Sequence, residues 1–193
     1  MLSWSISFLA VALLMAAHAV PGLAAEDVLV EAERAGEGVE VRARALIAAP
    51  QPLVWEVLTN YELLPSFIPG IARSVVRSRN GGAVVVDQSG EATYLVFTFP
   101  IEVRLEVTES APDWVASRAV SGNLRRMDGR YDIQPGPRGG VLLRYIGLIE
   151  PAFELPPLIG TAALRSIVEQ QFTAMVAEIE RRAALAVIPE TPK

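Results

Sequence analysis

The chain has 193 residues with a formal net charge of −5, and 51% of its residues are hydrophobic. This length and composition fit one ordinary globular domain with a substantial core. The acidic balance argues against a nucleic-acid partner, because the average surface would repel phosphate groups. Small groups of arginines alternate with other residues, as on the solvated face of a strand, and we expect them on the outside of a sheet.

The first 25 residues carry no charged side chain and run apolar up to a break at Pro21-Gly22. Small residues then end the segment at Ala25, which is the pattern of a secretory signal peptide. We therefore predict cleavage near Ala25 and export to a periplasm. An uncleaved membrane anchor is the alternative, because only the amino terminus supplies positive charge there. The absence of cysteine excludes a thioether-linked lipid anchor.

The residues that perform most common chemistry are missing after residue 25. His18 lies inside the predicted signal, the chain has no cysteine, and its one lysine is Lys193. Nucleophilic triads, zinc sites and Schiff-base lysines all need those residue types. We therefore expect no metal and no cofactor, and no Gly-rich phosphate loop is present either.

The predicted elements begin with two strands in "VLVEAERAGEGVEVRARALI", joined at Gly36–Gly38. Pro50 and Pro52 then end the second strand and start a helix. In "VWEVLTNYELLPSFIPGI" the apolar spacing predicts two short helices, with Asn60 capping the second. Prolines in this stretch prevent a long continuation.

A period-two pattern continues from Ala72 to Ile149 and predicts five or six antiparallel strands. It is clearest in "IEVRLEVTE", where every second residue is apolar. In "ATYLVFTFP" both faces are apolar, so we expect a strand that is covered twice or lines a cavity. A proline-rich apolar loop, "AFELPPLIG", then leads into an amphipathic helix from about Thr161 to Val187, followed by a frayed tail at 189–193.

The order of these elements, with "VWEVLTNYELLPSFIPGI", "VVVDQSG", "LEVTE" and the "EP" before the last helix, resembles the START-like superfamily. It is most similar to the polyketide cyclase/dehydrase and lipid-transport family, a relative of the coenzyme Q-binding branch. The resemblance covers roughly residues 39–186. The chain departs from the family pattern at Asn60, at Gly129-Arg130-Tyr131 and at Val141.

The resemblance implies an α+β helix-grip fold over residues 26–188. In that fold a curved antiparallel β-sheet wraps around the long C-terminal helix, and two short helices after the first strand close one end. A largely apolar cavity lies between sheet and helix. Trp55, Leu63, Leu64, Phe67 and Ile68 would belong to the end wall or the cavity mouth.

Candidate ligand-binding residues follow from this cavity. Polar residues on apolar strand faces are the sharpest candidates, because an unpaired buried polar group costs about 1–3 kcal/mol. The alternatives are ordinary core packing for the helix residues, and solvent or an acidic partner for Arg125. The candidates are Phe67, Gln88, Phe97, Arg125, Tyr131, Val168, Phe172, Met175 and Ile179.

The apolar loop before the last helix is a candidate gate at the cavity mouth, with Phe153, Leu155 and Leu158 as its apolar side chains. It would make transient contact with a membrane during loading. A packed connection beneath the helix is the alternative.

Two functions remain open from the sequence. The first is a carrier or binding protein for a hydrophobic small molecule such as a lipid, an isoprenoid or a quinone. The second is a cyclase or dehydratase acting on an aromatic or polyketide-like substrate, in which Arg125 would stabilise an enolate while Tyr131 or a carboxylate moves a proton. A protein-interaction module with a vestigial cavity is a third class.

Overall fold

A computed structural model describes residues 26–152 and 157–186 of the chain, with the side chains of residues 26, 27, 97 and 157–159 left aside. The elements in chain order are β1 (Glu26–Ala35), β2 (Gly38–Ile47), α1 (Gln51–Thr59), the 3₁₀ helix η1 (Tyr61–Ser66), β3 (Ile71–Asn80), β4 (Ala83–Tyr94), β5 (Phe97–Ser110), β6 (Trp114–Gly122), β7 (Leu124–Pro135), the 3₁₀ turn η2 (Pro137–Gly139), β8 (Val141–Pro151) and α2 (Pro157–Ala186).

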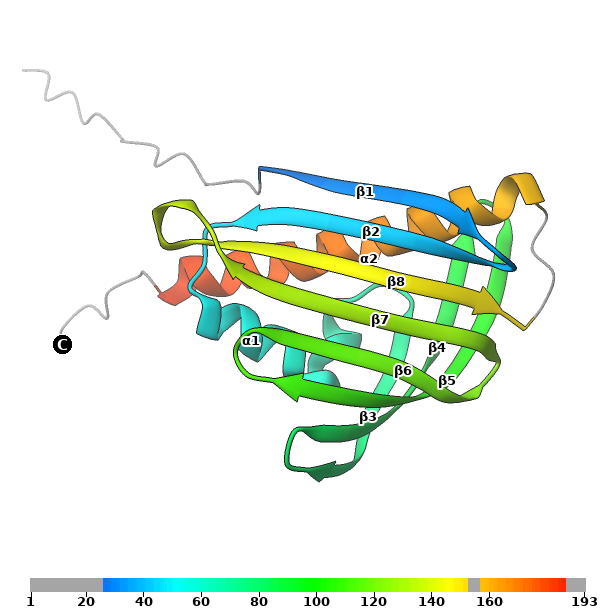
Figure 1. Cartoon of the computed structure of the whole chain (residues 1–193), viewed down its shortest axis with the longest axis horizontal. Helices are drawn as coiled ribbons and strands as arrows, with labels where there is room; N and C mark the ends of the chain where they lie inside the picture. The colour runs from blue at the N-terminus through cyan, green and yellow to red at the C-terminus, as the bar shows by residue number, and fades with distance from the viewer. Residues whose placement is uncertain (1–25, 153–156, 187–193) are drawn as a thin grey trace, which may run out of the picture.

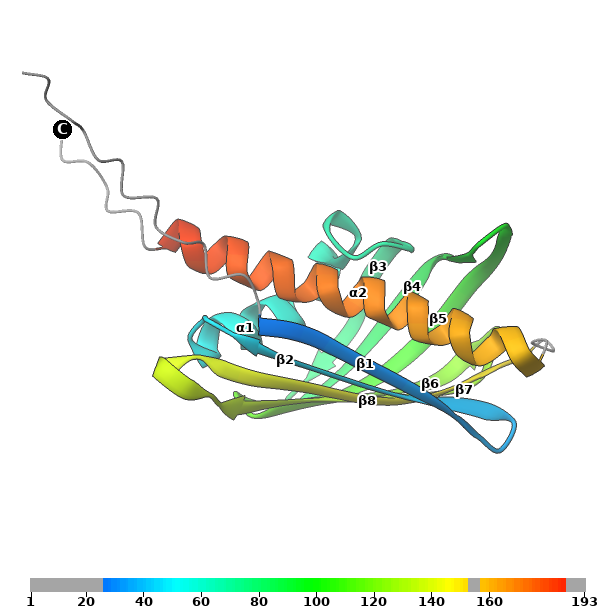
Figure 2. The same ribbon diagram turned by 90° about the horizontal axis from the view of Figure 1, so that it is seen from above.

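All the described strands form one antiparallel sheet in the order β1-β2-β8-β7-β6-β5-β4-β3 (Figure 1). The sheet is strongly curved, and α2 lies along its concave face with β3, β4 and β5 rising on one side of the helix (Figure 2). This confirms the predicted α+β helix-grip fold.

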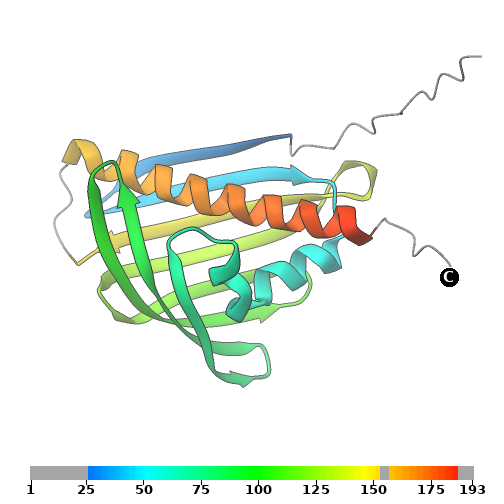
Figure 3. The same ribbon diagram turned by 180° about the vertical axis from the view of Figure 1, so that it is seen from behind.

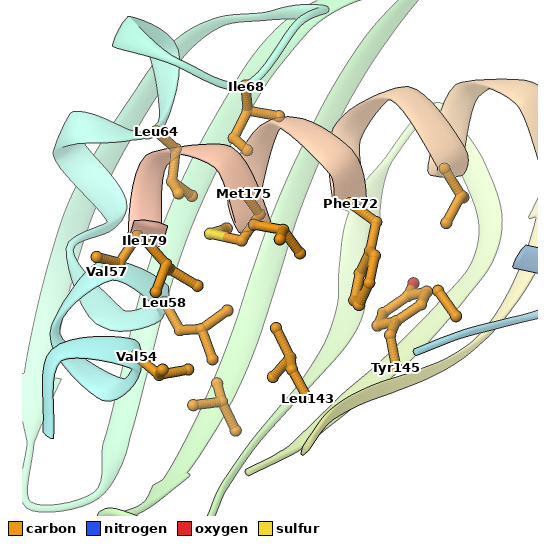
Figure 4. Close-up of a cluster of buried hydrophobic side chains, with 14 of the residues drawn as sticks. Val54, Val57, Leu58, Leu64, Ile68, Leu143, Tyr145, Phe172, Met175 and Ile179 are labelled. Carbon is orange, nitrogen blue, oxygen red and sulfur yellow. The ribbon is translucent and has the colours of Figure 1, made fainter. Parts of the chain in front are cut away.

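The core lies between the concave face and α2, and strand periodicity explains it. In β8, Val141, Leu143, Tyr145 and Ile149 are buried while alternate residues are more exposed. Residues two apart in a strand point to the same face, so each strand supplies one apolar row. Figure 4 shows these rows meeting side chains from α1 and α2.

Helices α1 and η1 close one end of the concave face, near the C-terminal half of α2 (Figure 3). Val54, Val57 and Leu58 of α1 are buried, as are Leu64 and Ile68. The prediction of two short helices is therefore confirmed.

The predicted cap by the Asn60 side chain is wrong. Asn60 ends α1 and begins η1 at the same residue, and its side chain caps neither helix. Its main-chain carbonyl accepts the Leu63 amide at 3.1 Å instead, and its own amide donates to the Glu56 carbonyl at 3.1 Å. With so short a junction, the backbone itself supplies the partners that a cap would provide.

The stretch "ATYLVFTFP" is a hairpin rather than one strand, which corrects the sequence prediction. Tyr94 pairs with Phe97 across the turn Leu95-Val96. Leu95 has φ 55, a conformation that bulky residues rarely adopt and that hairpin turns usually assign to glycine or asparagine. Because neither residue type occurs there, the sequence carries no turn signal.

Helix α2 begins at Pro157, four residues before the predicted start at Thr161. Proline suits the first turn of a helix, since its missing N–H has no partner there and its φ is already helical.

Of the gate candidates, Phe153 and Leu155 lie outside the described residues, as does the side chain of Leu158. The gate remains a prediction, as does the signal in residues 1–25. Neither helix of the described chain has the length and apolarity needed to cross a bilayer.

Candidate ligand-binding site

An inner chamber of about 150 Å³ lies between the concave face and α2. Strands β4 to β8 supply one wall, α2 supplies the opposite wall, and α1 and η1 close the end. Among the described residues no charged side chain lines it. The lining residues are Leu58, Tyr61, Leu64, Ile68, Ile71, Val86, Gln88, Leu105, Val107, Val115, Ser117, Met127, Tyr131, Tyr145, Ile149, Val168, Gln171, Phe172 and Met175.

An outer chamber of about 130 Å³ adjoins the inner one. It extends toward the β4–β5 hairpin and the first turns of α2, where Ala92, Phe99, Ala163 and Leu164 line it. The two chambers are contiguous because they share part of their lining. The shared residues are Ile71, Gln88, Met127, Ile149, Val168 and Gln171.

Helix α2 contributes three of its four predicted ligand-binding residues to the chambers: Val168, Phe172 and Met175. Ile179 is fully buried and lines neither chamber, because it lies one helical turn further along, against Val57 of α1 (Figure 4). The core-packing alternative therefore describes Ile179.

Two amide side chains lie where the chambers meet. Gln88 donates from Nε2 to the Ser74 hydroxyl at 3.3 Å, and Ser74 is itself buried. Gln171 donates from Nε2 to the Pro69 carbonyl at 3.2 Å. The predicted position of Gln88 on an inward face is confirmed, and each amide already has one protein partner.

Two tyrosines place neutral polar groups in the inner chamber. The rings of Tyr131 and Tyr145 have centroids 4.7 Å apart, and the Tyr131 ring is parallel to that of Phe172 at 6.4 Å. Figure 4 shows Tyr145 rising from β8 toward Phe172. Burial raises the pKa of Tyr131 well above its usual range and that of Tyr145 to about 12. Both phenols are therefore neutral at physiological pH.

A third tyrosine, Tyr61 of η1, lines the chamber, but its hydroxyl makes its hydrogen bond to a residue that does not line the chamber. Its hydroxyl donates to Glu109 Oε1 at 2.8 Å, and Arg79 donates to both oxygens of that carboxylate at 2.9 and 2.8 Å. Burial, followed by the bond to Glu109, raises the Tyr61 pKa. This contact fixes η1 to the ends of β3 and β5.

Arg125 does not point into the chamber, which corrects the inward position inferred from its spacing. Its side chain is 57% exposed, and it pairs with Glu37 at 2.8 Å and Glu150 at 3.1 Å. The cause is a register shift between Leu124 and Arg126, because an extra residue at a bulge breaks the alternation that relates Arg125 to Met127.

Two further candidates, Phe67 and Phe97, are not placed in the chambers. Phe67 is half-buried against the core without lining either chamber. Phe97 begins β5, and its side chain lies outside the described part of the chain. Trp55 likewise packs against the core, and Leu63 is exposed.

The sequence interpretation missed several groups that the chamber brings together. Tyr145, Ser117 and Gln171 line the inner chamber and are not among the candidates from the sequence. Glycines inside strands often mark a hollow or a close approach. Gly129 and Gly147, which are register partners in β7 and β8, were the available signal.

A curved antiparallel sheet that holds a long C-terminal helix over an apolar chamber defines a START-like protein of the helix-grip type. Residues 47–176 match the model of the family described as polyketide cyclase / dehydrase and lipid transport, and the chain belongs to this family. None of the curated proteins is significantly similar to it in sequence.

Solved structures share the fold. A START superfamily protein from Mycobacterium smegmatis is 15% identical, with a TM-score of 0.65, over 74% of this chain and 98% of that one. A STAR-related lipid transfer protein from Xanthomonas axonopodis (fragment 25-204) is 17% identical with a TM-score of 0.65, covering 81% and 95%. The Zhui aromatase/cyclase from Streptomyces sp. R1128 is 17% identical with a TM-score of 0.64, covering 80% and 98%. At these identities the likeness establishes the fold alone.

Proposed function

We propose that this protein binds a hydrophobic small molecule, such as a lipid, an isoprenoid or a quinone, and carries it without converting it. The observation that carries the proposal is the pair of contiguous chambers, whose described lining is mainly aliphatic and aromatic. Binding sites for small molecules are typically apolar hollows with a few polar groups. A cavity of about 150 Å³ with such a lining can hold a ring-sized apolar molecule.

Carriage is favoured over cyclisation or dehydration by the position of the charged groups. The enzyme hypothesis needs Arg125 to stabilise an enolate in the cavity while Tyr131 or a carboxylate moves a proton. Arg125 instead pairs with Glu37 and Glu150 outside the chambers. Glu91 is the one carboxylate in the described lining of the outer chamber, and it is exposed to solvent.

Contact with a membrane during loading is part of this proposal. Leu95 and Val96, at the tip of the β4–β5 hairpin, are 75% and 88% exposed. The same hairpin supplies Ala92 and Phe99 to the outer chamber, so the apolar tip belongs to the strands that border its mouth. Replacing both tip residues by serine would reduce co-sedimentation with phosphatidylcholine vesicles, whereas serine at Val120 on β6 would not. Equal co-sedimentation of all three proteins would remove this part of the proposal.

We also propose a site of action. The uncharged apolar segment at residues 1–25 supports export, so we place the protein in the periplasm, free or held at the inner membrane by that segment. Fractionation of the native host with an antibody against the chain would test this placement.

The carrier proposal is tested by native mass spectrometry of the protein purified from its own host, followed by solvent extraction. We expect a stoichiometric hydrophobic compound. Val168→Phe, which fills space shared by both chambers, should lose that compound, while Val120→Phe, the same change at an exposed residue, should retain it. An empty wild-type protein that also fails to bind a panel of lipids would contradict the proposal.

A further inference from the structure

Three hydroxyls of the inner chamber, those of Tyr131, Tyr145 and Ser117, have no hydrogen-bond partner within the described part of the chain. Each other tyrosine or amide of its lining has a protein partner: Tyr61 bonds Glu109, Gln88 bonds Ser74, and Gln171 bonds Pro69. Within the described chain, neither Tyr131 nor Tyr145 makes a hydrogen bond through its hydroxyl. A hydroxyl that lines an apolar chamber without a protein partner is satisfied only by a ligand or by water.

The backbone beneath Tyr145 is shaped to hold this hydroxyl in place. A methyl group on Gly147 would lie 2.2 Å from the Tyr145 oxygen, so only glycine leaves room for the phenol in this position. Across the strand pair, a methyl group on Gly129 would lie 3.1 Å from the Tyr145 oxygen and 3.4 Å from Ser117 Oγ. The hydroxyls of Tyr145 and Ser117 therefore converge on the hollow above Gly129.

The charge of the chamber limits what these hydroxyls can bind. No arginine, lysine or histidine among the described residues lines either chamber, so a carboxylate or phosphate would be buried without a countercharge. An ammonium group would likewise find no carboxylate in the inner chamber. A neutral phenol is a good donor to a carbonyl oxygen and needs no ionised partner.

We propose that Tyr131 and Tyr145 form a subsite that selects an uncharged ligand whose ring-borne carbonyl oxygen accepts their hydrogen bonds. The Phe172 ring, parallel to that of Tyr131, supplies an aromatic wall beside the same subsite. This inference rests on the proposed function, because it specifies the ligand of the same chambers.

Calorimetric titration with three probes of nearly equal shape tests the inference. The probes are 1-tetralone, which has the carbonyl, tetralin, which lacks it, and 1,2,3,4-tetrahydro-1-naphthoate, which carries a charge. Wild-type protein should bind the ketone roughly three- to tenfold more tightly than the hydrocarbon, the effect of about one neutral hydrogen bond. The carboxylate should bind about a hundredfold more weakly than the ketone.

Substitution of the two phenols then identifies the donors. Tyr131→Phe with Tyr145→Phe should lower ketone affinity to that of tetralin and leave tetralin affinity unchanged. Tyr94→Phe removes a phenol that lines neither chamber and should leave all affinities as they are. The infrared C=O stretch of bound 1-tetralone should lie at lower frequency in wild type than in the double variant, which a purely structural role would not produce.

Each remaining outcome of the titration counts against the subsite. Equal binding of ketone and hydrocarbon by wild type, or tight binding of the carboxylate, would overturn the subsite and leave the carrier proposal intact. A double variant that keeps the ketone preference would also overturn the subsite. Failure of wild-type protein to bind any of the three probes would overturn the subsite, whereas the carrier proposal is decided separately by solvent extraction of the native protein and by the lipid panel.

Discussion

The two faces of the sheet use side chains in opposite ways. On the concave face, β4 to β8 present apolar residues with a few neutral hydroxyls and amides to α2. On the convex face, arginines form ion pairs with carboxylates of neighbouring strands. Asp87 pairs with Arg77 and with Arg104, each at 2.6 Å, and Glu106 pairs with Arg118 at 2.9 Å. The grouped arginines of the sequence lie on this solvated face, as predicted, and several of them are ion-paired.

The two faces also differ in how much their side chains contribute to the stability of the fold. Exposed ion pairs contribute about 0–1 kcal/mol each, whereas one buried aliphatic side chain contributes about 1.5–3 kcal/mol. The hydrogen bonds from Arg104 and Arg77 hold the pKa of Asp87 well below its usual range, so this cluster stays ionised even in acid. Because these charged side chains lie on the convex face, the described lining of the inner chamber is uncharged and can discriminate against charged ligands.

The sharpest test of this contrast is at Ile179, which is fully buried between α1 and the sheet. Ile179→Ala should lower the free energy of unfolding by about 2–5 kcal/mol, because it removes buried methylenes and leaves a cavity. Ile179→Val, the matched smaller change, should cost about 0.5–1.5 kcal/mol. Urea titration followed by circular dichroism measures both, and a loss below 1 kcal/mol for alanine would contradict the packing described for α2.

A smaller effect is expected at Tyr61, where the concave and convex patterns meet. Tyr61→Phe removes the hydrogen bond to Glu109 but leaves that carboxylate paired with Arg79. The expected loss is about 0.5–1.5 kcal/mol, again by urea titration. Adding Arg79→Gln should cost more than the sum of the single changes, because the carboxylate of Glu109 then has neither partner; strict additivity would exclude a shared network.

On α2, the ionisation of Glu178 makes the free energy of unfolding depend on pH in the acid range. Hydrogen bonds from Arg181 and Arg182, at 2.7 and 2.8 Å, lower the pKa of Glu178 to about 2 from its ordinary 4.5. A lowered folded-state pKa stabilises the protein fully above pH 4.5, and this contribution is lost as the pH falls toward 2. Glu178→Gln should flatten the stability profile between these values, by less than about 1 kcal/mol. An unchanged profile would show that these bonds do not persist in solution.

The smallest effect is expected on the convex face, at Arg118 and Glu106, whose side chains are 67% and 53% exposed. Arg118→Gln should change the free energy of unfolding by about 0.5 kcal/mol or less. A double-mutant cycle with Glu106→Gln measures the coupling directly. A coupling above 1 kcal/mol would mean that the convex face stabilises the fold more than its exposure suggests.

The sequence predicted the fold well because its signals are periodic and local. The alternation in β5 and β8 assigned the inward rows, and the glycines at residues 36 and 38 located the first hairpin. The order of the elements along the chain was then enough to predict the helix-grip fold. The apolar stripe of α2 likewise assigned Val168, Phe172 and Met175 to the face that lines the chamber.

The site was less predictable because it depends on exceptions to those patterns. A bulge at the start of β7 turned Arg125 outward, and a hairpin turn without glycine separated β4 from β5. The convergence of Tyr145 and Ser117 over Gly129 brings together residues from three consecutive strands. Such a meeting is set by register across β6, β7 and β8, which no single segment encodes.

The sheet does not close on itself, so β1 and β3 each leave one edge without a strand partner within the described chain. The exposed charged side chains are mainly acidic on β1, where Glu31 and Glu33 lie beside Arg34, and basic on β3, where they are Arg73, Arg77 and Arg79. Two copies joined by a two-fold axis at either edge would bring like charges together. The edges therefore disfavour a continuous sheet across such a two-fold pair.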